Sequence, residues 1–178
     1  MPKIRPLTRR QFVASAAAVA VLPAVTARTQ TPTSTTSKGA VPMTTLTPYL
    51  LFDGTCREAM EFYHSVFDGE LSIMKVSESP ARDHMPASQH NKIINAHLKS
   101  SAIEISASDW LMPNRTPARG NTVCLYLSGC TPDELKALFA KLSEGAQVTD
   151  PLKEVFFGTY GALNDKYGNR WMFQANRA

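Results

Sequence analysis

Two side chains near the middle of the sequence, His97 and Glu104, could act together as a catalytic acid–base pair. They lie in two extended runs joined at Ser100-Ser101, and the side chains of a strand alternate between the faces of its sheet. If these two serines form a two-residue hairpin turn, His97 lies directly opposite Glu104, and Asn95 lies opposite Ser106. A carboxylate beside an imidazole orients the ring and raises its basicity, which suits a general base. The alternative is a cross-strand polar pair that tolerates exposure and has no chemical role.

Neighbouring strands place aromatic and polar side chains on the same open face of the predicted sheet. The side chains expected to face the helices are apolar: Leu50, Phe52, Ile94, Ala96, Leu98, Ile103, Ile105, Val123, Leu125, Leu127, Trp171 and Phe173. Alternation then leaves Tyr49, Cys124 and Tyr126 on the other face. A polar and aromatic face suits a ligand cleft, in which Tyr49, Tyr126 and Phe157 would clamp a planar molecule. The alternative is that these rings pack against protein.

The elements that would hold these residues recur as an internal repeat. When the sequence is shifted by 75 residues, Leu50, Phe52 and Gly54 fall on Leu125, Leu127 and Gly129. Each trio is a short apolar strand that ends at a glycine and leads into a helix. A repeat of this size indicates two copies of one supersecondary unit.

The order of elements predicts an α+β fold of two βαβββ modules, at about residues 46–108 and 120–175. The first copy has strands at 47–52, 70–76, 92–99 and 102–106, a helix at 55–67 and a mobile loop at 77–90. The second copy has a strand at 121–127, a helix at 132–142 and three strands that reach Gln174. Residues 109–120 link the two copies.

The N-terminus predicts export by the twin-arginine route. Arg9 and Arg10 precede an apolar stretch at 13–25 that is too short to span a bilayer, and small residues at 25–27 suit cleavage. Residues 1–27 are therefore expected to be a removed signal that engages the twin-arginine translocase, with a periplasmic or secreted product. Residues 28–45 are a Thr/Ser/Pro-rich linker, and residues 46–178 form the folded domain. Two alternatives remain, an ordinary Ala-rich amphipathic start and an internal start at Met43 that yields a cytosolic form.

The charge of the chain belongs to this predicted signal. The signal holds four of the 19 basic residues and none of the 15 acidic ones, so the remainder has a formal net charge of zero. A neutral domain gives no case for a nucleic-acid partner. After removal of the signal, no membrane partner is expected either.

Three cysteines in an exported chain leave at least one unpaired. Cys56 opens a helix, where the helix dipole could lower its pKa, and Cys124 lies within a strand. For both residues the favoured reading is a small buried hydrophobic side chain.

Four segments together resemble the vicinal oxygen chelate superfamily, and within it the PhnB-like branch. They are residues 47–50, 56–63, 109–110 and 164–172, within a match from about Leu46 to Phe173. The resemblance implies two βαβββ modules whose mixed sheets curl around a cleft, the glyoxalase/bleomycin-resistance fold, and a homodimer. The aromatic segment at 156–161 also resembles the PhnB-like branch.

The resemblance also locates the superfamily's four metal-binding positions. They fall here on Thr47, Glu104, Thr122 and Met172, of which only Glu104 is a plausible ligand. A catalytic divalent ion usually needs three protein ligands, so the metal site is predicted to be lost even if His97 joins Glu104. No cofactor is expected, and a divalent metal is disfavoured. Some relatives are labelled ubiquinone-pathway methyltransferases, but no glycine-rich strand-to-helix loop of a doubly wound sheet supports that chemistry.

Two functions follow as alternatives, beside a third reading in which the domain is a scaffold with no small-molecule role. The first is an exported protein that binds a small organic molecule in the cleft without turning it over. The second is a glyoxalase-like lyase, isomerase or hydrolase that uses His97 and Glu104 as catalytic residues. The residues expected to line the cleft are Tyr49, Asn95, Ser106, Cys124, Tyr126, Phe157, Tyr160 and Met172.

Overall fold

The computed structural model describes residues 45–176 apart from residues 114, 116 and 121. The predicted export signal at 1–27 and nearly all of the predicted linker at 28–45 lie outside the described residues. Among the helices that are described, none is long and apolar enough to cross a membrane.

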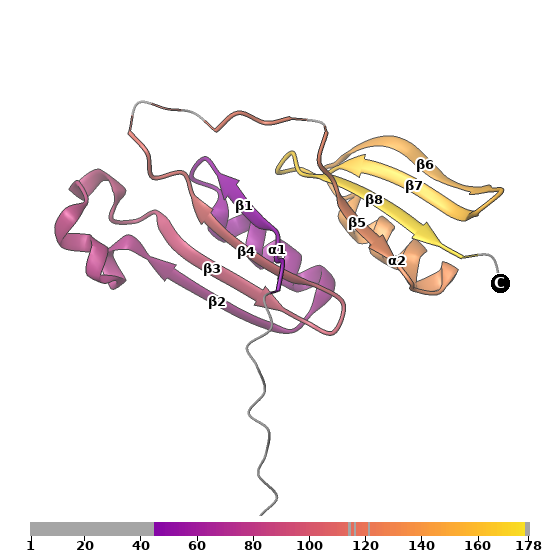
Figure 1. The fold of residues 1–178 in the computed structure, drawn as a ribbon, viewed down its shortest axis with the longest axis horizontal. Helices are drawn as coiled ribbons and strands as arrows, with labels where there is room; N and C mark the ends of the chain where they lie inside the picture. The colour runs from indigo at the N-terminus through magenta and orange to yellow at the C-terminus, as the bar shows by residue number, and fades with distance from the viewer. Residues whose placement is uncertain (1–44, 114, 116, 121, 177–178) are drawn as a thin grey trace, which may run out of the picture. The chain divides into compact units, whose positions relative to one another are not determined.

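Two βαβββ modules make up the described chain, which confirms the predicted fold class (Figure 1). The first contains β1 (Tyr49–Phe52), α1 (Cys56–Phe67), β2 (Glu70–Lys75), β3 (Ile93–Lys99) and β4 (Glu104–Asp109). The second contains β5 (Leu125–Ser128), α2 (Pro132–Leu142), β6 (Gln147–Val155), β7 (Gly158–Asn164) and β8 (Arg170–Ala175). The sheets have the strand orders β1-β4-β3-β2 and β5-β8-β7-β6. We call the side of each sheet away from its helix the open face.

Glycines with positive φ explain why the repeat is visible in the sequence. Gly54 and Gly129 follow β1 and β5 with φ of 83° and 85°, and Gly69 and Gly145 follow the helices with φ of 101° and 69°. Residues other than glycine adopt such angles only with strain. The same two turns therefore require glycine in both modules.

The two helices begin with different caps. Thr131 caps α2 in a capping box, because its hydroxyl accepts from the Glu134 backbone and the Glu134 carboxylate accepts from the Thr131 N–H. At α1 the first N–H, that of Cys56, instead donates to the Asp109 carboxylate at 3.0 Å. Asp109 is the buried last residue of β4, so the prediction that it starts the inter-module link is wrong.

The turn between β3 and β4 is longer than the predicted two residues. His97 pairs with Ser106 and Lys99 pairs with Glu104, so Glu104 does not lie directly opposite His97. The Ser100 side chain sets this turn, since its oxygen accepts from the backbone N–H groups of residues 102 and 103. Asn95 pairs with Met74 of β2, so no β4 pairing joins it to Ser106 as predicted.

Two predicted apolar positions are also wrong. An irregularity between Met74 and Lys75 shifts the register of β2 against β3, and Ile93 is buried in place of Ile94. In the second module β5 begins only at Leu125, and Val123 is 79% exposed because it precedes the strand. Alternation of side chains holds only where a strand is regularly paired, so it fails at the irregularity beside β3 and ahead of β5.

The segment at 77–90, predicted as a mobile loop, contains three short 3₁₀ helices. They span Val76–Glu78, Pro80–His84 and Ala87–Gln89. The His90 ring lies 3.2 Å and 3.1 Å from the carbonyl oxygens of Arg82 and Met85. These contacts of the His90 ring hold the segment in an ordered conformation. The prolines of the segment predicted turns but not this order.

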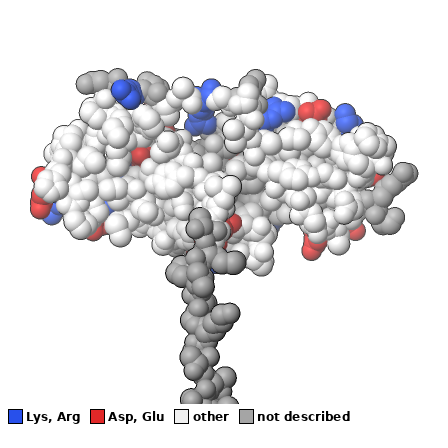
Figure 2. Space-filling model, in the orientation of Figure 1, with Lys and Arg blue, Asp and Glu red and all other residues white. Residues whose placement is uncertain are grey.

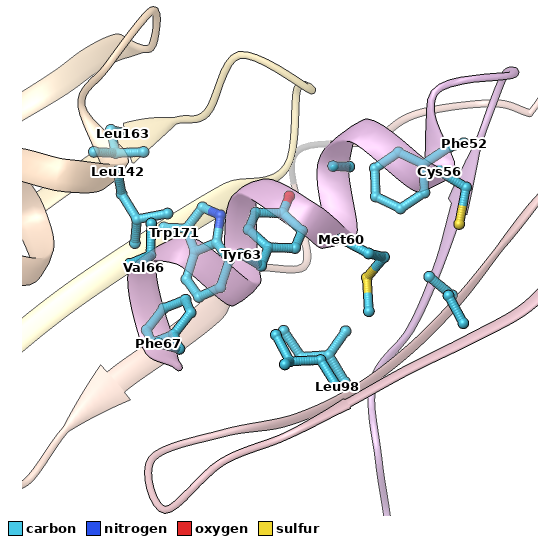
Figure 3. Packing of buried hydrophobic residues seen from close by; sticks show 14 of the residues in the cluster. Phe52, Cys56, Met60, Tyr63, Val66, Phe67, Leu98, Leu142, Leu163 and Trp171 are labelled. Atoms are coloured by element: carbon cyan, nitrogen blue, oxygen red, sulfur yellow. The ribbon is translucent and has the colours of Figure 1, made fainter. Parts of the chain in front are cut away.

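A single hydrophobic core joins the modules. Tyr63 of α1 packs edge-on against Trp171 of β8, and the two side chains lie next to each other in Figure 3. Their ring centroids are 5.6 Å apart, and both belong to the same core. Trp171 and Phe173 are buried, as the sequence predicts. The carboxylate of Asp165 lies within this contact and accepts from the Tyr63 hydroxyl at 2.6 Å and from the Trp171 indole at 2.8 Å. This buried polar link fixes the second module against α1 of the first.

Candidate functional site

The open face of the first sheet brings His97, Glu104 and Ser106 together. The His97 Nε2 atom lies 3.5 Å from a Glu104 carboxylate oxygen, and Nδ1 lies 3.1 Å from the Ser106 hydroxyl. The other Glu104 oxygen lies 3.2 Å from the Lys99 ammonium. The predicted proximity of His97 and Glu104 therefore holds, although they meet diagonally across the ladder.

This arrangement has the order hydroxyl, imidazole, carboxylate. When Nε2 carries the ring proton it points to Glu104, and Nδ1 accepts from the Ser106 hydroxyl. Such an imidazole can take a proton from the hydroxyl or from a bound molecule. The side chains of His97 and Glu104 are both 37% exposed, so their contact contributes little to stability.

The register extends this cluster into a polar row across the first sheet. Tyr49 of β1 pairs with Ser106, Ser106 pairs with His97, and His97 pairs with Ser72 of β2. Asn95 is exposed on β3 but pairs with Met74 in the next row, outside the cluster. The row thus runs from the imidazole to Tyr49 at the β1 edge.

At the open face of the second sheet the structure joins Cys124, Tyr126 and Met172, although Cys124 precedes β5 and does not lie within a strand as predicted. The Cys124 sulfur lies 3.1 Å from the Met172 sulfur, and the Tyr126 hydroxyl donates to the side-chain oxygen of Gln174. Tyr126 also pairs with Met172 across β5 and β8. Gln174 was not predicted, but it lies two residues after Met172 in β8 and therefore on the same face of the sheet. This alternation is visible in the sequence and could have identified it.

Phe157 lies at the β6–β7 hairpin, and Tyr160 of β7 pairs with Gln174 of β8, beside the side chains just described. The ring centroids of Phe157 and Tyr160 are 6.0 Å apart, and Phe156 stacks edge-on against Phe157 at 4.8 Å. Phe156 is 89% exposed. These rings form an aromatic group that continues from Gln174 to the hairpin and, within the described chain, lines no pocket together with Tyr49 or Cys124.

A pocket of about 410 Å³ lies where the two modules meet. Its walls come from β1, from the linker that enters β5, and from the β7–β8 turn. Two predicted residues line it, Tyr49 from the first module and Cys124 from the second. The remaining predicted residues do not.

Among the pocket residues that the sequence reasoning missed, four have aromatic, cationic or amide side chains: Trp110, Arg119, Asn169 and Arg170. Trp110 and Arg119 lie in the linker, whose path no periodicity reports. Arg170 had a usable signal, since it shares the parity of Met172 in β8. A second pocket of about 500 Å³ adjoins the first and shares Gly120, Gly168 and Arg170 with it.

The cysteines differ in environment. Burial, with a smaller contribution from the Asp109 carboxylate, raises the pKa of Cys56 to about 12, so the predicted lowering by the helix dipole is wrong. Burial also raises the pKa of Cys130, with the Glu134 carboxylate adding to it. Cys56 is fully buried and Cys124 half-buried. Cys56 is therefore an inert core thiol.

Two of the four predicted metal positions, Glu104 and Met172, are not equivalent in the two modules. Leu50 pairs with Ala107 and Leu125 pairs with Trp171, so Met172 corresponds through the repeat to Ser108 and not to Glu104. Within the described part of the chain, no group of three or more His, Cys, Asp or Glu side chains is placed to hold a metal ion. Glu104 is adjacent only to His97 among such groups in the cluster.

Comparison with known proteins identifies the family. Residues 44–174 match the profile of the family described as 3-demethylubiquinone-9 3-methyltransferase. Protein YjdN of Escherichia coli (strain K12) is 26% identical over 137 residues, which cover 71% of this chain and 92% of that protein.

Solved structures agree with this match. Protein PA1353 from Pseudomonas aeruginosa is 30% identical with a TM-score of 0.68, covering 76% of this chain and 100% of that one. A PhnB protein from Bacillus cereus is 27% identical with a TM-score of 0.60, covering 74% and 99%. A glyoxylase/bleomycin resistance protein/dioxygenase domain from Frankia sp. EAN1pec, at 16% identity and a TM-score of 0.52, shares the fold. The chain therefore belongs to the PhnB-like (3-demethylubiquinone-9 3-methyltransferase) family of the vicinal oxygen chelate superfamily.

Proposed function

We propose that this protein binds a small organic molecule in the pocket between its modules and does so without the divalent metal of its superfamily. One observation carries the proposal: Tyr49 and Cys124, predicted as ligand-lining from opposite modules, line the same pocket. Its volume of about 410 Å³ suits a small ligand, since such sites usually measure about 300–1,000 Å³. Tyr49 and Trp110 offer aromatic surface, and Asn169 and Arg170 offer hydrogen-bond donors.

The donor set supports binding without a metal. The superfamily's positions carry two threonines, one glutamate and one methionine, a mixture that suits neither a hard nor a soft ion. The repeat does not relate Glu104 to Met172, so the residues do not converge as a symmetric set. This supports binding through aromatic and polar contacts.

A substitution pair tests the proposal. Small molecules released from the denatured protein would be identified by mass spectrometry for the unchanged chain and for Tyr49→Ala and Tyr126→Ala. Both tyrosines are 52% exposed, but only Tyr49 lines the pocket. We expect Tyr49→Ala to lose the molecule and Tyr126→Ala to retain it. Equal retention in both variants would contradict the pocket assignment.

We also propose that the protein is exported and acts in the periplasm or outside the cell. The support is the Arg9-Arg10 pair ahead of the short apolar stretch, with the translocase as a transient partner. Replacing both arginines by lysine should retain the protein in the cytoplasm in a fractionation experiment. Continued recovery from the periplasm would rule this route out.

A homodimer is a further part of the proposal. Exposed apolar side chains on the open faces and at the hairpin tip, among them Leu51 and Phe156, support it, because large exposed apolar groups often mark contacts between proteins. Size-exclusion chromatography with light scattering should give twice the chain mass. A monomer at micromolar concentration would refute the dimer.

The second candidate is a metal-independent lyase, isomerase or hydrolase, favoured by the geometry of His97. Its two ring nitrogens face Glu104 and Ser106 at 3.5 Å and 3.1 Å. If the protein turns over a molecule identified as above, His97→Ala should abolish turnover and leave the circular dichroism spectrum unchanged. Unchanged kinetics would remove this candidate. Lys99→Gln, which removes only the lysine partner of Glu104, serves as the control.

A further inference from the structure

Cationic side chains surround the pocket where the modules meet. Arg119 and Arg170 line the first pocket, and Lys166 and Arg170 line the adjoining one. In the view of Figure 2, Lys and Arg side chains gather along the edge where Figure 1 places the linker, whereas acidic side chains lie mostly on the other edges. The local charge is therefore positive although the folded domain as a whole is neutral.

In the described chain, Asp165 is the one acidic residue that lines either pocket, and its carboxylate does not neutralise the positive charge that a ligand would meet. Asp165 is buried, and its two oxygens accept four hydrogen bonds from within the protein. Two of them come from the backbone N–H groups of Tyr167 and Asn169, both at 2.9 Å. A carboxylate held in this way has no free oxygen to approach the arginines.

The two arginines are placed to bind an anion. Arg170 lies on the first position of β8 and shares the parity of Met172 on the open face. Arg119 donates one N–H to the Tyr167 carbonyl, and its guanidinium lies against Gly168, where a Cβ would meet its nitrogen at 2.5 Å. A guanidinium has five N–H donors, so donors remain for a ligand. Among the described residues, neither arginine forms an ion pair with a carboxylate.

Lys166 acts differently from the arginines. Its ammonium lies 4.0 Å from the centre of the Phe62 ring and 5.6 Å from that of Tyr167. This cation–π contact holds the lysine against α1. It adds positive potential without a direct contact to a molecule in the first pocket.

From this geometry we infer that the small molecule bound at the inter-module pocket carries an oxyanion group, a carboxylate or a phosphate-type group, held by Arg119 and Arg170. The inference rests on the proposed function, because it names the chemical class of the ligand for the same pocket. Guanidinium groups form paired, charge-assisted hydrogen bonds with either type of oxyanion. Tyr49 and Trp110 in the same pocket favour an aromatic or planar body beside the anionic group.

Trp110 provides a second observation. Its indole N–H is buried and lacks an acceptor among the described residues, and its side chain lines the pocket. An indole nitrogen only donates, and a buried donor without a partner is costly. An anion oxygen in the pocket would offer the missing acceptor after a small rotation of the ring.

Matched probes test the inference by nuclear magnetic resonance. Benzoate and benzamide have nearly the same shape and differ in charge, and inorganic phosphate serves as a competitor without a ring. The reporters are the backbone amides of Tyr49, Cys124 and Asn169 and the indole signal of Trp110. The variants are Arg170→Gln and Arg119→Gln. The control is Arg82→Gln, the same change on an exposed residue that lines neither pocket.

We expect benzoate to bind at least about tenfold more tightly than benzamide, which matches the strength of a charge-assisted contact. Each pocket variant should remove most of that preference, Arg82→Gln should keep it, and phosphate should displace benzoate. If both probes bind equally, or if the pocket variants keep the preference, the anion inference is wrong and the pocket itself still stands. If neither probe shifts the reporter signals, the anion inference also fails. The proposed function is then tested separately, by identifying the molecules released from the denatured protein.

Discussion

Removing the Asp165 carboxylate should loosen the contact that joins the two modules. In Asp165→Ala the Tyr63 hydroxyl and the Trp171 indole lose their common acceptor, and both rings are buried in the core. The turn that carries Asn169 also loses two backbone hydrogen bonds to Asp165. This turn leads directly into Arg170, so the change reaches the wall of the pocket.

The size of the effect follows from the orphaned donors. Each buried donor left without a partner costs about 1–3 kcal/mol, so two of them cost about 2–6 kcal/mol. The turn N–H groups are only partly buried and can bind water, so they add little. We therefore expect a loss of about 4 kcal/mol in the free energy of unfolding, or roughly 10 °C in the melting temperature.

Urea denaturation followed by tryptophan fluorescence measures this loss. Asp165→Asn, which keeps one acceptor oxygen, should fall between the unchanged protein and Asp165→Ala. Asp83→Ala removes an exposed carboxylate with no hydrogen-bond partner among the described residues and should change stability by less than about 0.5 kcal/mol. A double-mutant cycle with Tyr63→Phe should show coupling of about 1 kcal/mol or more. A loss below about 1 kcal/mol in Asp165→Ala would refute the account of this link.

Three further predictions concern stability and are checked by the same denaturation assay. Gly69→Ala should lower the free energy of unfolding by more than about 2 kcal/mol, because a Cβ there lies 2.3 Å from a backbone oxygen. Gly54→Ala, which has open space around its Cβ, should lower it by only about 1–2 kcal/mol. Equal losses in the two variants would contradict this. Thr131→Ala should lower the free energy of unfolding by about 1 kcal/mol, and Thr55→Ala should leave it nearly unchanged. The reason is that, of these two helix caps, only Thr131 makes a side-chain hydrogen bond to its helix. A larger loss in Thr55→Ala would be inconsistent with the caps. Burial raises the pKa of Cys56 from 9.0 to about 12, so the unfolded chain loses this proton first and stability falls as the pH rises from about 9 to 12. Cys56→Ala should flatten that decline, and an unchanged slope would argue against a buried neutral thiol.

The repeat made most of the fold predictable. Turn glycines and apolar pairs are local signals, and both modules use them in the same places, so two βαβββ units followed from sequence alone. The helix at Pro132–Leu142 was predicted with its observed bounds because Thr131 and the proline mark its start. The pair His97 and Glu104 was predicted to be close, and it is.

Other features depend on contacts that alternation does not report. The Ser100 hydroxyl accepts two backbone hydrogen bonds and so makes the β3–β4 turn longer than predicted. Glu104 is therefore a diagonal neighbour of His97 and not the directly opposite residue. Arg119 reaches the pocket only because the linker folds back onto Tyr167. Such long-range contacts of irregular segments decide which side chains line a pocket, and periodicity is silent about them.

The central claim is a metal-independent small-molecule site between the modules. Native mass spectrometry combined with elemental analysis, on protein purified from the periplasm without chelator, tests it most directly. We predict a retained small organic molecule and far less than one divalent ion per chain. A stoichiometric divalent ion would contradict this account and would point to Glu104 and His97 as ligands of a glyoxalase-like metal centre.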